Sequence, residues 1–151
     1  MIPFLPPTSN NIYVTNRSGV KFLTKEGSAF KKNAISHVQQ EKMPFLANIA
    51  DTMRNNPLAV FEIDYVLYFD DDDILNKSYG SGKKAAAKTR YKRMDVENRV
   101  KLLSDSVCTA IGVDDSLFFR TGQAKCSARM VGGVPQIHVY FYQADPMRFG
   151  L

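Results

Sequence analysis

Four carboxylates lie on either side of one predicted helix, and their types and spacing suit metal-assisted chemistry. Asp95 and Glu97 stand at its start, and Asp114 and Asp115 follow its end. Carboxylate oxygens are hard ligands of the kind that Mg²⁺ prefers, and no set of His and Cys residues indicates zinc. Without a metal, clustered acids would repel one another and raise one another's pKa values. The plain alternative is a helix cap followed by an acidic turn.

The helix between these acids is predicted over residues 96–111. At 100° per residue its apolar side chains share one stripe, as in a helix that packs on a core. They are Val96, Val100, Leu103, Val107, Ala110 and Ile111. Asn98, Lys101 and Asp105 fall on the opposite face. An acid at the start suits the helix dipole and caps free N–H groups, and Gly112 is placed to end the helix.

The elements around this helix are predicted from periodicity and turn signals. Residues 12–14 and 20–23 are short β-type runs around a turn and predict a hairpin. Thr24 is placed to cap a helix over 25–42, and Pro44 begins a second helical piece that ends at Met53.

The second half of the chain predicts the sheet. Residues 59–69 alternate apolar and polar and predict a strand. Residues 124–131 and 136–142 predict a β-hairpin through a two-residue turn at Gly132-Gly133. His138 is predicted to lie on the outward face of the second strand. Together the elements predict an α+β fold, a mixed sheet with helices on one side.

Composition bounds the class of protein. A chain of 151 residues, 44% apolar and 23% charged, predicts a single globular domain over 1–151. The net charge of +5 and the pI of about 9.2 favour a polyanionic partner. Cys108 and Cys126 lack metal-motif spacing and indicate free thiols in a reducing cytoplasm. No apolar run approaches the roughly 18 residues of a membrane span, and no signal peptide is expected.

A long segment over about 70–93 is predicted to be a flexible basic insertion. It begins with four acids, passes through a Gly/Ser-rich stretch and ends in cations. The candidates for DNA contact are Lys83, Lys84, Lys88, Arg90, Lys92 and Arg93. One interpretation is a solvated loop; the other is a flap that orders on DNA, with Tyr79 and Tyr91 stacking on unpaired bases.

Two motifs resemble one known family. Asp-x-Glu-Asn over 95–98, then Lys101, an apolar helix, Gly112 and an Asp-Asp pair resemble the RusA family of Holliday-junction resolvases. The opening Pro6-Pro7-Thr8-Ser9-Asn10-Asn11-Ile12-Tyr13 is similar to that family's N-terminal motif. The chain departs from the best-known members at Glu97, where they carry Asp. Glutamate is one methylene longer and is still an oxygen ligand.

The resemblance implies a function and roles for individual residues. The implied enzyme is a Mg²⁺-dependent endodeoxyribonuclease, in which Mn²⁺ can replace Mg²⁺, that resolves four-way DNA junctions by paired nicks in recombination and repair. The implied metal ligands are Asp95, Glu97 and Asp115, with Asp114 close by. Lys101 would act on the phosphate, and Asn98 would orient a ligand or the scissile phosphate. Asn10 and Asn11 would hold their loop near the active site and are candidates for DNA contact.

The implied assembly is a homodimer, because a two-fold junction suits a symmetric dimer. Residues 96–111 form a helix about 24 Å long, so we expect each site to combine acids from both subunits. The expected location is the cytoplasm of a bacterial or phage-infected cell. Two alternatives remain: a non-catalytic protein that binds branched DNA, and a metal nuclease that acts on flaps or other simpler DNA.

Overall fold

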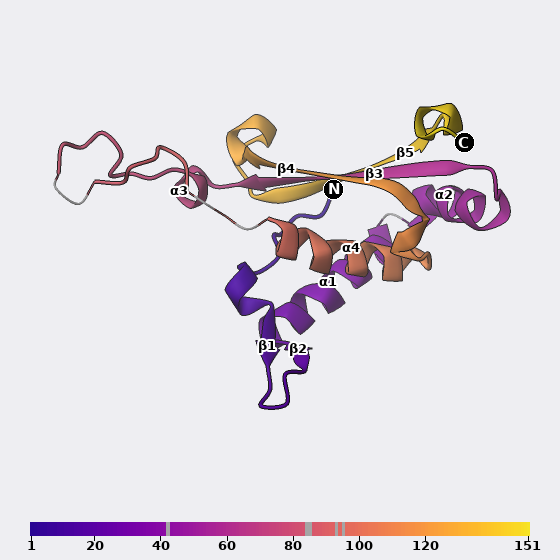
Figure 1. The fold of residues 1–151 in the computed structure, drawn as a ribbon, viewed down its shortest axis with the longest axis horizontal. Helices are drawn as coiled ribbons and strands as arrows, with labels where there is room; N and C mark the ends of the chain where they lie inside the picture. The colour runs from indigo at the N-terminus through magenta and orange to yellow at the C-terminus, as the bar shows by residue number, and fades with distance from the viewer. Residues whose placement is uncertain (42, 84–85, 93, 95) are drawn as a thin grey trace.

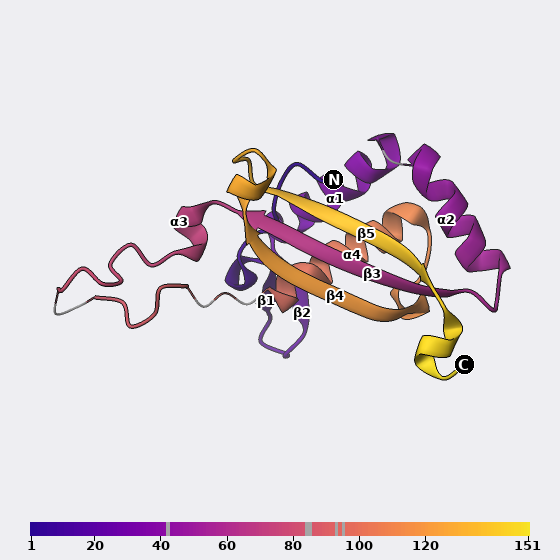
Figure 2. The same cartoon turned by 90° about the horizontal axis from the view of Figure 1, so that it is seen from above.

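A computed structural model describes residues 1–41, 43–83, 86–92, 94 and 96–151 of the chain. Its largest sheet has three strands in the order β4-β3-β5. β3 (Val60–Phe69) lies in the centre, parallel to β4 (Phe118–Ser127) and antiparallel to β5 (Gln136–Ala144). Figure 2 shows β3 between its two neighbours. The predicted mixed sheet is therefore confirmed.

The central position of β3 follows from its sequence. Alternate side chains point to the helices, and Ile63, Tyr65 and Leu67 are fully buried. Both edges of the strand find hydrogen-bonding partners because a strand lies on either side. The opposite face carries Glu62, which is buried by ion pairs to Arg120 and to Arg148 of the C-terminal turn.

The predicted hairpin over 124–142 is wrong. β4 and β5 pair with β3 and not with each other. β4 runs without a break from Phe118 and ends at Ser127, short of the predicted end at residue 131. The residues after Ser127 form a 3₁₀ turn, η3 (Ala128–Val131), which Ser127 caps: its Oγ accepts from Arg129 N at 3.2 Å. The Gly132-Gly133 pair does turn the chain, with positive φ at both residues. β3, the most apolar strand, occupies the centre of the sheet. The chain from β4 to β5 therefore has to cross the end of β3.

Three helices cover one face of the sheet, as predicted (Figure 1): α1 (Lys25–Glu41), α2 (Met43–Asn55) and α4 (Glu97–Ile111). Thr24 Oγ1 accepts from Gly27 N at 3.0 Å and caps α1 as expected. Phe30, Ala34 and Val38 of α1 are buried, which confirms its predicted inner face.

α4 is buried more widely than its apolar stripe predicted. Arg99, Leu102, Ser106 and Cys108 are buried as well. The reason is that α4 packs against α1 on one side and lies beneath the sheet on the other (Figure 1). Gly112 ends the helix in the left-handed conformation, as predicted. The N-cap residue is Val96, which makes no side-chain cap; the expected acidic cap at Asp95 lies outside the described residues.

The predicted N-terminal hairpin is present. β1 (Tyr13–Thr15) pairs antiparallel with β2 (Lys21–Leu23), and the pair projects from the helical layer (Figure 1). Its turn is stabilised by Asn16, whose Oδ1 accepts from Ser18 N at 3.0 Å and Val20 N at 2.9 Å. A short 3₁₀ turn, η1 (Ser9–Asn11), precedes β1.

Candidate active site

The outer face of α4 presents the polar residues of the central motif. Glu97, Asn98 and Lys101 are exposed, and Asp105 is half-buried further along the same face. They point away from the core because the apolar residues of α4 occupy the sides toward the sheet and α1. This part of the predicted arrangement is confirmed, while Asp95 lies outside the described residues.

The second pair of acids follows the end of α4. Asp114 is the N-cap of η2 (Asp115–Leu117), and its Oδ1 accepts from Ser116 N at 2.8 Å. Hydrogen bonds from Ser116, first from its side chain and then from this backbone N–H, favour the charged form and lower the pKa of Asp114. Asp115 is exposed. Asp114 thus caps a turn, and both Asp114 and Asp115 are exposed.

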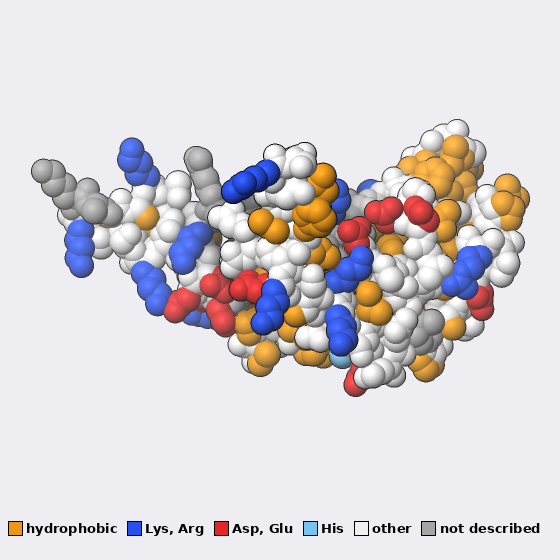
Figure 3. Space-filling model, turned by 90° about the horizontal axis from the view of Figure 1, so that it is seen from below, with side chains coloured by type: hydrophobic (Ala, Val, Ile, Leu, Met, Phe, Trp, Pro, Cys, Tyr) orange, Lys and Arg blue, Asp and Glu red, His pale blue; other side chains and the backbone are white. Residues whose placement is uncertain are grey.

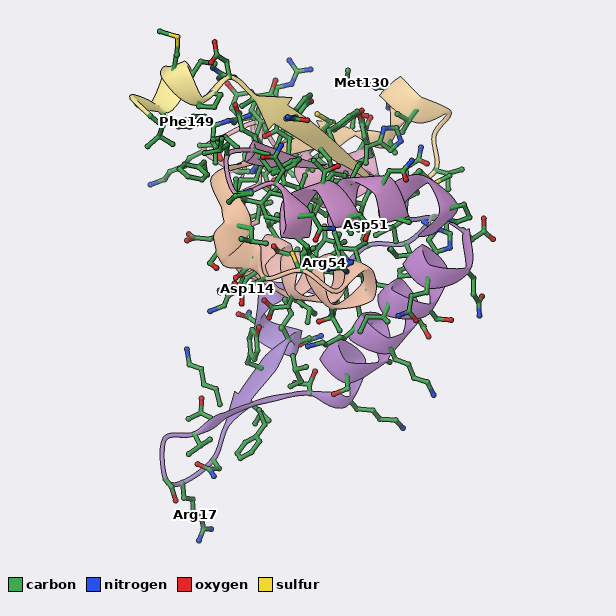
Figure 4. The ribbon with its side chains drawn as sticks, turned by 90° about the vertical axis from the view of Figure 1, so that its right-hand side faces the viewer. Arg17, Asp51, Arg54, Asp114, Met130 and Phe149 are labelled. Atoms are coloured by element: carbon green, nitrogen blue, oxygen red, sulfur yellow. The ribbon has the colours of Figure 1, made fainter. Side chains whose placement is uncertain are left out.

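The turn that ends α4 is fixed by a cation from another helix. Arg54 of α2 donates to Ile111 O at 2.7 Å and to Gly112 O at 3.1 Å. A positive charge at this position suits the negative end of the helix dipole. Figure 4 shows Arg54 beside the end of α4, with Asp51 and Asp114 nearby. The position of the acidic turn is therefore set by α2 as well as by α4.

Asp105 is the residue around which charges from several elements gather. Burial raises the pKa of its carboxyl, Lys31 of α1 lowers it, Asp115 raises it, and Lys101 lowers it. The phenol pKa of Tyr13, in the hairpin, is raised by burial and by the charge of Asp105. We call these five residues the Asp105 cluster. Figure 3 views the molecule from below, on the side of the helices and the hairpin. It shows acidic side chains beside Lys and Arg side chains to the right of the hairpin.

The structure does not bring the carboxylate of Glu97 to those of Asp105 and Asp115 within one chain. Eight residues of helix separate Glu97 from Asp105, which corresponds to about 12 Å along the axis. Among the residues that the structure describes, no three His, Cys, Asp or Glu side chains are close enough to hold a metal ion. Among the described acids, Glu97 and the Asp114–Asp115 pair therefore lie at opposite ends of α4, as the length of the helix predicted.

The cluster adds three residues that the motifs did not single out as site residues: Tyr13, Lys31 and Asp105. A signal for Asp105 was present, because it shares a helical face with Lys101 four residues earlier. Nothing local in the sequence indicates that the loop after Gly112 returns toward Asp105, or that Lys31 and Tyr13 approach from other elements.

The N-terminal proline–asparagine loop is tied to the first turn of α4. Arg99 is buried, with its guanidinium 5.2 Å from the centre of the Phe69 ring, and its Nη1 lies 3.5 Å from Pro6 O. Asn10 and Asn11 are exposed, and the carbonyl of Asn11 accepts from Thr24 Oγ1. The loop thus lies near the end of α4 that carries Glu97, while no described contact assigns either asparagine a role.

The segment after β3 extends away from the body (Figure 1). It begins with a short helix, α3 (Asp71–Ile74), and is closed at its base by a bridge between Leu75 and Tyr91. The described cations Lys83, Lys88, Arg90 and Lys92 are exposed. Lys84 and Arg93 lie outside the described residues.

Two acids at the start of this segment, Asp71 and Asp72, contact side chains of the protein. Asp71 forms an ion pair with Arg129 and accepts from Ser127 Oγ at 2.6 Å. Asp72 accepts from Lys77 Nζ at 2.7 Å. These contacts give Asp71 and Asp72 structural tasks at the base of the segment.

Both motifs fall within one family of nucleases. The family model described as Endodeoxyribonuclease RusA matches residues 3–140, which include the proline–asparagine loop and all of α4 with its flanking acids. The chain belongs to the RusA family. The resemblance drawn from the two motifs is thereby confirmed. Among curated proteins, no sequence matches the chain.

Membership of the RusA family implies an endodeoxyribonuclease that acts on Holliday junctions, and RusA nucleases generally depend on a divalent metal. Exposed carboxylates at both ends of α4 fit such a metal, since Asp115 and Glu97 present oxygen donors to solvent. In the described part of the chain, no helix is long and apolar enough to cross a membrane.

Proposed function

We propose that this RusA-family protein is a Mg²⁺-dependent endonuclease that resolves four-way DNA junctions by paired nicks, and that Mn²⁺ can replace Mg²⁺. One observation carries the proposal: exposed acids stand at both ends of α4, with Lys101 between them on the same outer surface. In the cytoplasm of a bacterial or phage-infected cell, this activity would serve recombination and repair.

The residues have distinct chemical tasks in this proposal. Asp95, Glu97, Asp114 and Asp115 would hold the metal, which supplies a nucleophilic water, neutralises the phosphorane and stabilises the leaving oxygen. Lys101 places a cation on the outer face of α4, where it can bind a non-bridging phosphate oxygen. Asn98, also exposed at the start of α4, would orient the scissile phosphate or a ligand carboxylate.

We further propose that each site is shared between two subunits. Ligands of one Mg²⁺ bind it at about 2.1 Å, whereas Glu97 and Asp105, beside which Asp115 lies, are about 12 Å apart along α4. Two copies of α4 in antiparallel arrangement about a two-fold axis would bring Asp95 and Glu97 of one copy to Asp114 and Asp115 of the other. A two-fold arrangement also matches the symmetry of a four-way junction.

The deciding experiment compares synthetic four-way, flap and linear DNA, each with Mg²⁺ or with EDTA. We expect symmetric cuts in the four-way junction with Mg²⁺ and no cuts with EDTA. Preferred cutting of flaps would favour the simpler metal nuclease, and binding without cutting in any metal would favour the non-catalytic binder.

The matched variant is Asp95→Asn, which removes a charge with little change in size. We expect it to fold and to bind junctions but not to nick them. Unimpaired turnover by this variant at ordinary Mg²⁺ would remove Asp95 from the site.

A further inference from the structure

One face of the β1–β2 hairpin is apolar and exposed. Val14 lies directly opposite Phe22 in the antiparallel register, so the two side chains share a face. Val20, two residues before Phe22, follows the same alternation. Val14 is 54% exposed, and Val20 and Phe22 are each 50% exposed. The other face carries Tyr13 and Leu23, which pack against the core. We call Val14, Val20 and Phe22 the hairpin face.

The base of the hairpin is firmly attached to α1. Ile12 is fully buried, and Thr24 N donates to its carbonyl at 2.9 Å. A Cβ placed on Gly27 of α1 would lie 2.8 Å from Ile12 O and 3.2 Å from Leu23 Cδ2, so the chains touch closely there. The apolar side chains are therefore presented on a ribbon whose root cannot shift freely.

The charge of the hairpin favours a polyanion. Residues 12–25 contain Arg17, Lys21 and Lys25 and no acid. Arg17 lies at the tip, farthest from the sheet (Figure 4). A second copy of the chain is a poor occupant, because like charges would face each other across a two-fold axis. A stable protein interface also needs about 800 Å² per partner, and three half-exposed side chains offer well under that.

The hairpin stands next to the proposed site. Tyr13 of β1 lies within electrostatic range of Asp105, which in turn lies within range of Asp115 and Lys101. DNA with a phosphate at the Asp105 cluster would therefore meet the hairpin. Its cations would reach the flanking phosphates, and the hairpin face would meet the interior of the DNA.

We propose that the hairpin face inserts at the branch point of a DNA junction, with Phe22 stacking against a base exposed there. This inference rests on the proposed function and identifies the element that distinguishes branched from linear DNA. Val, Leu and Phe side chains form no hydrogen bonds with phosphates or base edges, and they bind DNA by entering between or against unstacked bases. A branch point offers such bases, whereas a continuous duplex must first be unstacked.

The test places 2-aminopurine, a fluorescent base that brightens when unstacked, at the branch point of a synthetic junction. Binding is measured in EDTA and, by rapid mixing, in Mg²⁺. Wild-type protein should raise the fluorescence. Phe22→Ser should abolish the rise and weaken junction binding at least about fivefold, the lower range for loss of one base–aromatic stack. Its binding to a linear duplex should stay within about twofold of wild type.

The matched control is Leu58→Ser, which alters a side chain that is 82% exposed between α2 and β3. It should behave as wild type, and both variants should keep the wild-type melting temperature. The proposal is overturned if Phe22→Ser retains the rise, if it weakens duplex and junction binding equally, or if wild type binds both DNAs equally. A change of sedimenting mass in Phe22→Ser would instead make the face an interface between copies.

The experiment distinguishes a protein that does not cleave junctions from one whose hairpin face does not bind the branch point. Binding and fluorescence are read without cleavage, so a wild-type protein that never cuts junctions still tests the hairpin face. Loss of the fluorescence rise in Phe22→Ser alone would then support a hairpin that recognises branched DNA in a non-catalytic protein.

Discussion

A mixed dimer gives the strongest test of a site shared across subunits. The change is to combine Glu97→Gln subunits with Asp115→Asn subunits, each of which should be inactive alone. If sites are shared, one site of the heterodimer carries both substitutions and the other carries neither. A purified heterodimer should then nick at about half the wild-type rate, and an equimolar random mixture at about a quarter.

The structure sets the reason for this expectation. Within one subunit, the carboxylate of Asp115 lies near Asp105, about 12 Å along α4 from Glu97. Two ligands of one Mg²⁺, each at about 2.1 Å, must approach far more closely than that. Side chains can close part of this gap, so a site within one chain would be strained while α4 remains a regular helix.

The assay uses two affinity tags to isolate heterodimers and a junction labelled on each strand. Single-strand nicks should return in the heterodimer, while paired resolution should not, because only one of two sites is intact. Tagged wild-type dimers provide the control for the tags. Heterodimers that nick no better than either parent would refute a shared site and would require both acid pairs to meet within one chain.

Three further outcomes are expected. Lys101→Ala should lower the cleavage rate with little change in melting temperature, because Lys101 is exposed on α4; a large loss of stability would make it structural. Deleting residues 80–88 should weaken junction binding and reduce the salt slope by about 0.9 per lost phosphate contact; an unchanged slope would make the segment a spacer. Burial raises the pKa of the Cys108 thiol from 9.0 to about 11, so a thiolate-directed reagent at pH 8 should modify Cys126 first. Between pH 9 and about pH 11 the thiol of Cys108 releases its proton in the unfolded chain but keeps it in the folded one. The melting temperature should therefore fall as pH rises through this range, and it should fall less in Cys108→Ala.

Local sequence predicted local structure well. The alternation of residues 59–69 predicted β3, Thr24 predicted the start of α1, and Gly112 predicted the end of α4. Each of these signals depends on neighbours a few residues away: side-chain periodicity, a side-chain oxygen that caps N–H groups, and a backbone conformation that glycine adopts freely. Features that depend on interactions between residues close in the sequence could therefore be predicted from the sequence.

Pairing and convergence were predicted less well, because they depend on the whole chain. The strand-like pattern before Gly132-Gly133 suggested a hairpin, yet β3 separates β4 from β5. The motif identified Lys101 and Asp115 but not that Asp105 would lie within electrostatic range of both. That arrangement depends on the turn after Gly112, which Arg54 holds from a different helix.

The position of β3 also has a consequence for synthesis on the ribosome. β3 is made well before either of its neighbours, and β5, which completes the sheet, is made last. Until β4 arrives the apolar strand has two unpaired edges, and until β5 arrives it still has one, which favours association with other chains. Pairing of segments so distant in sequence is also slow. The growing chain is therefore most vulnerable to aggregation between the emergence of β3 and that of β5, and a chaperone that binds extended apolar segments would act on it there.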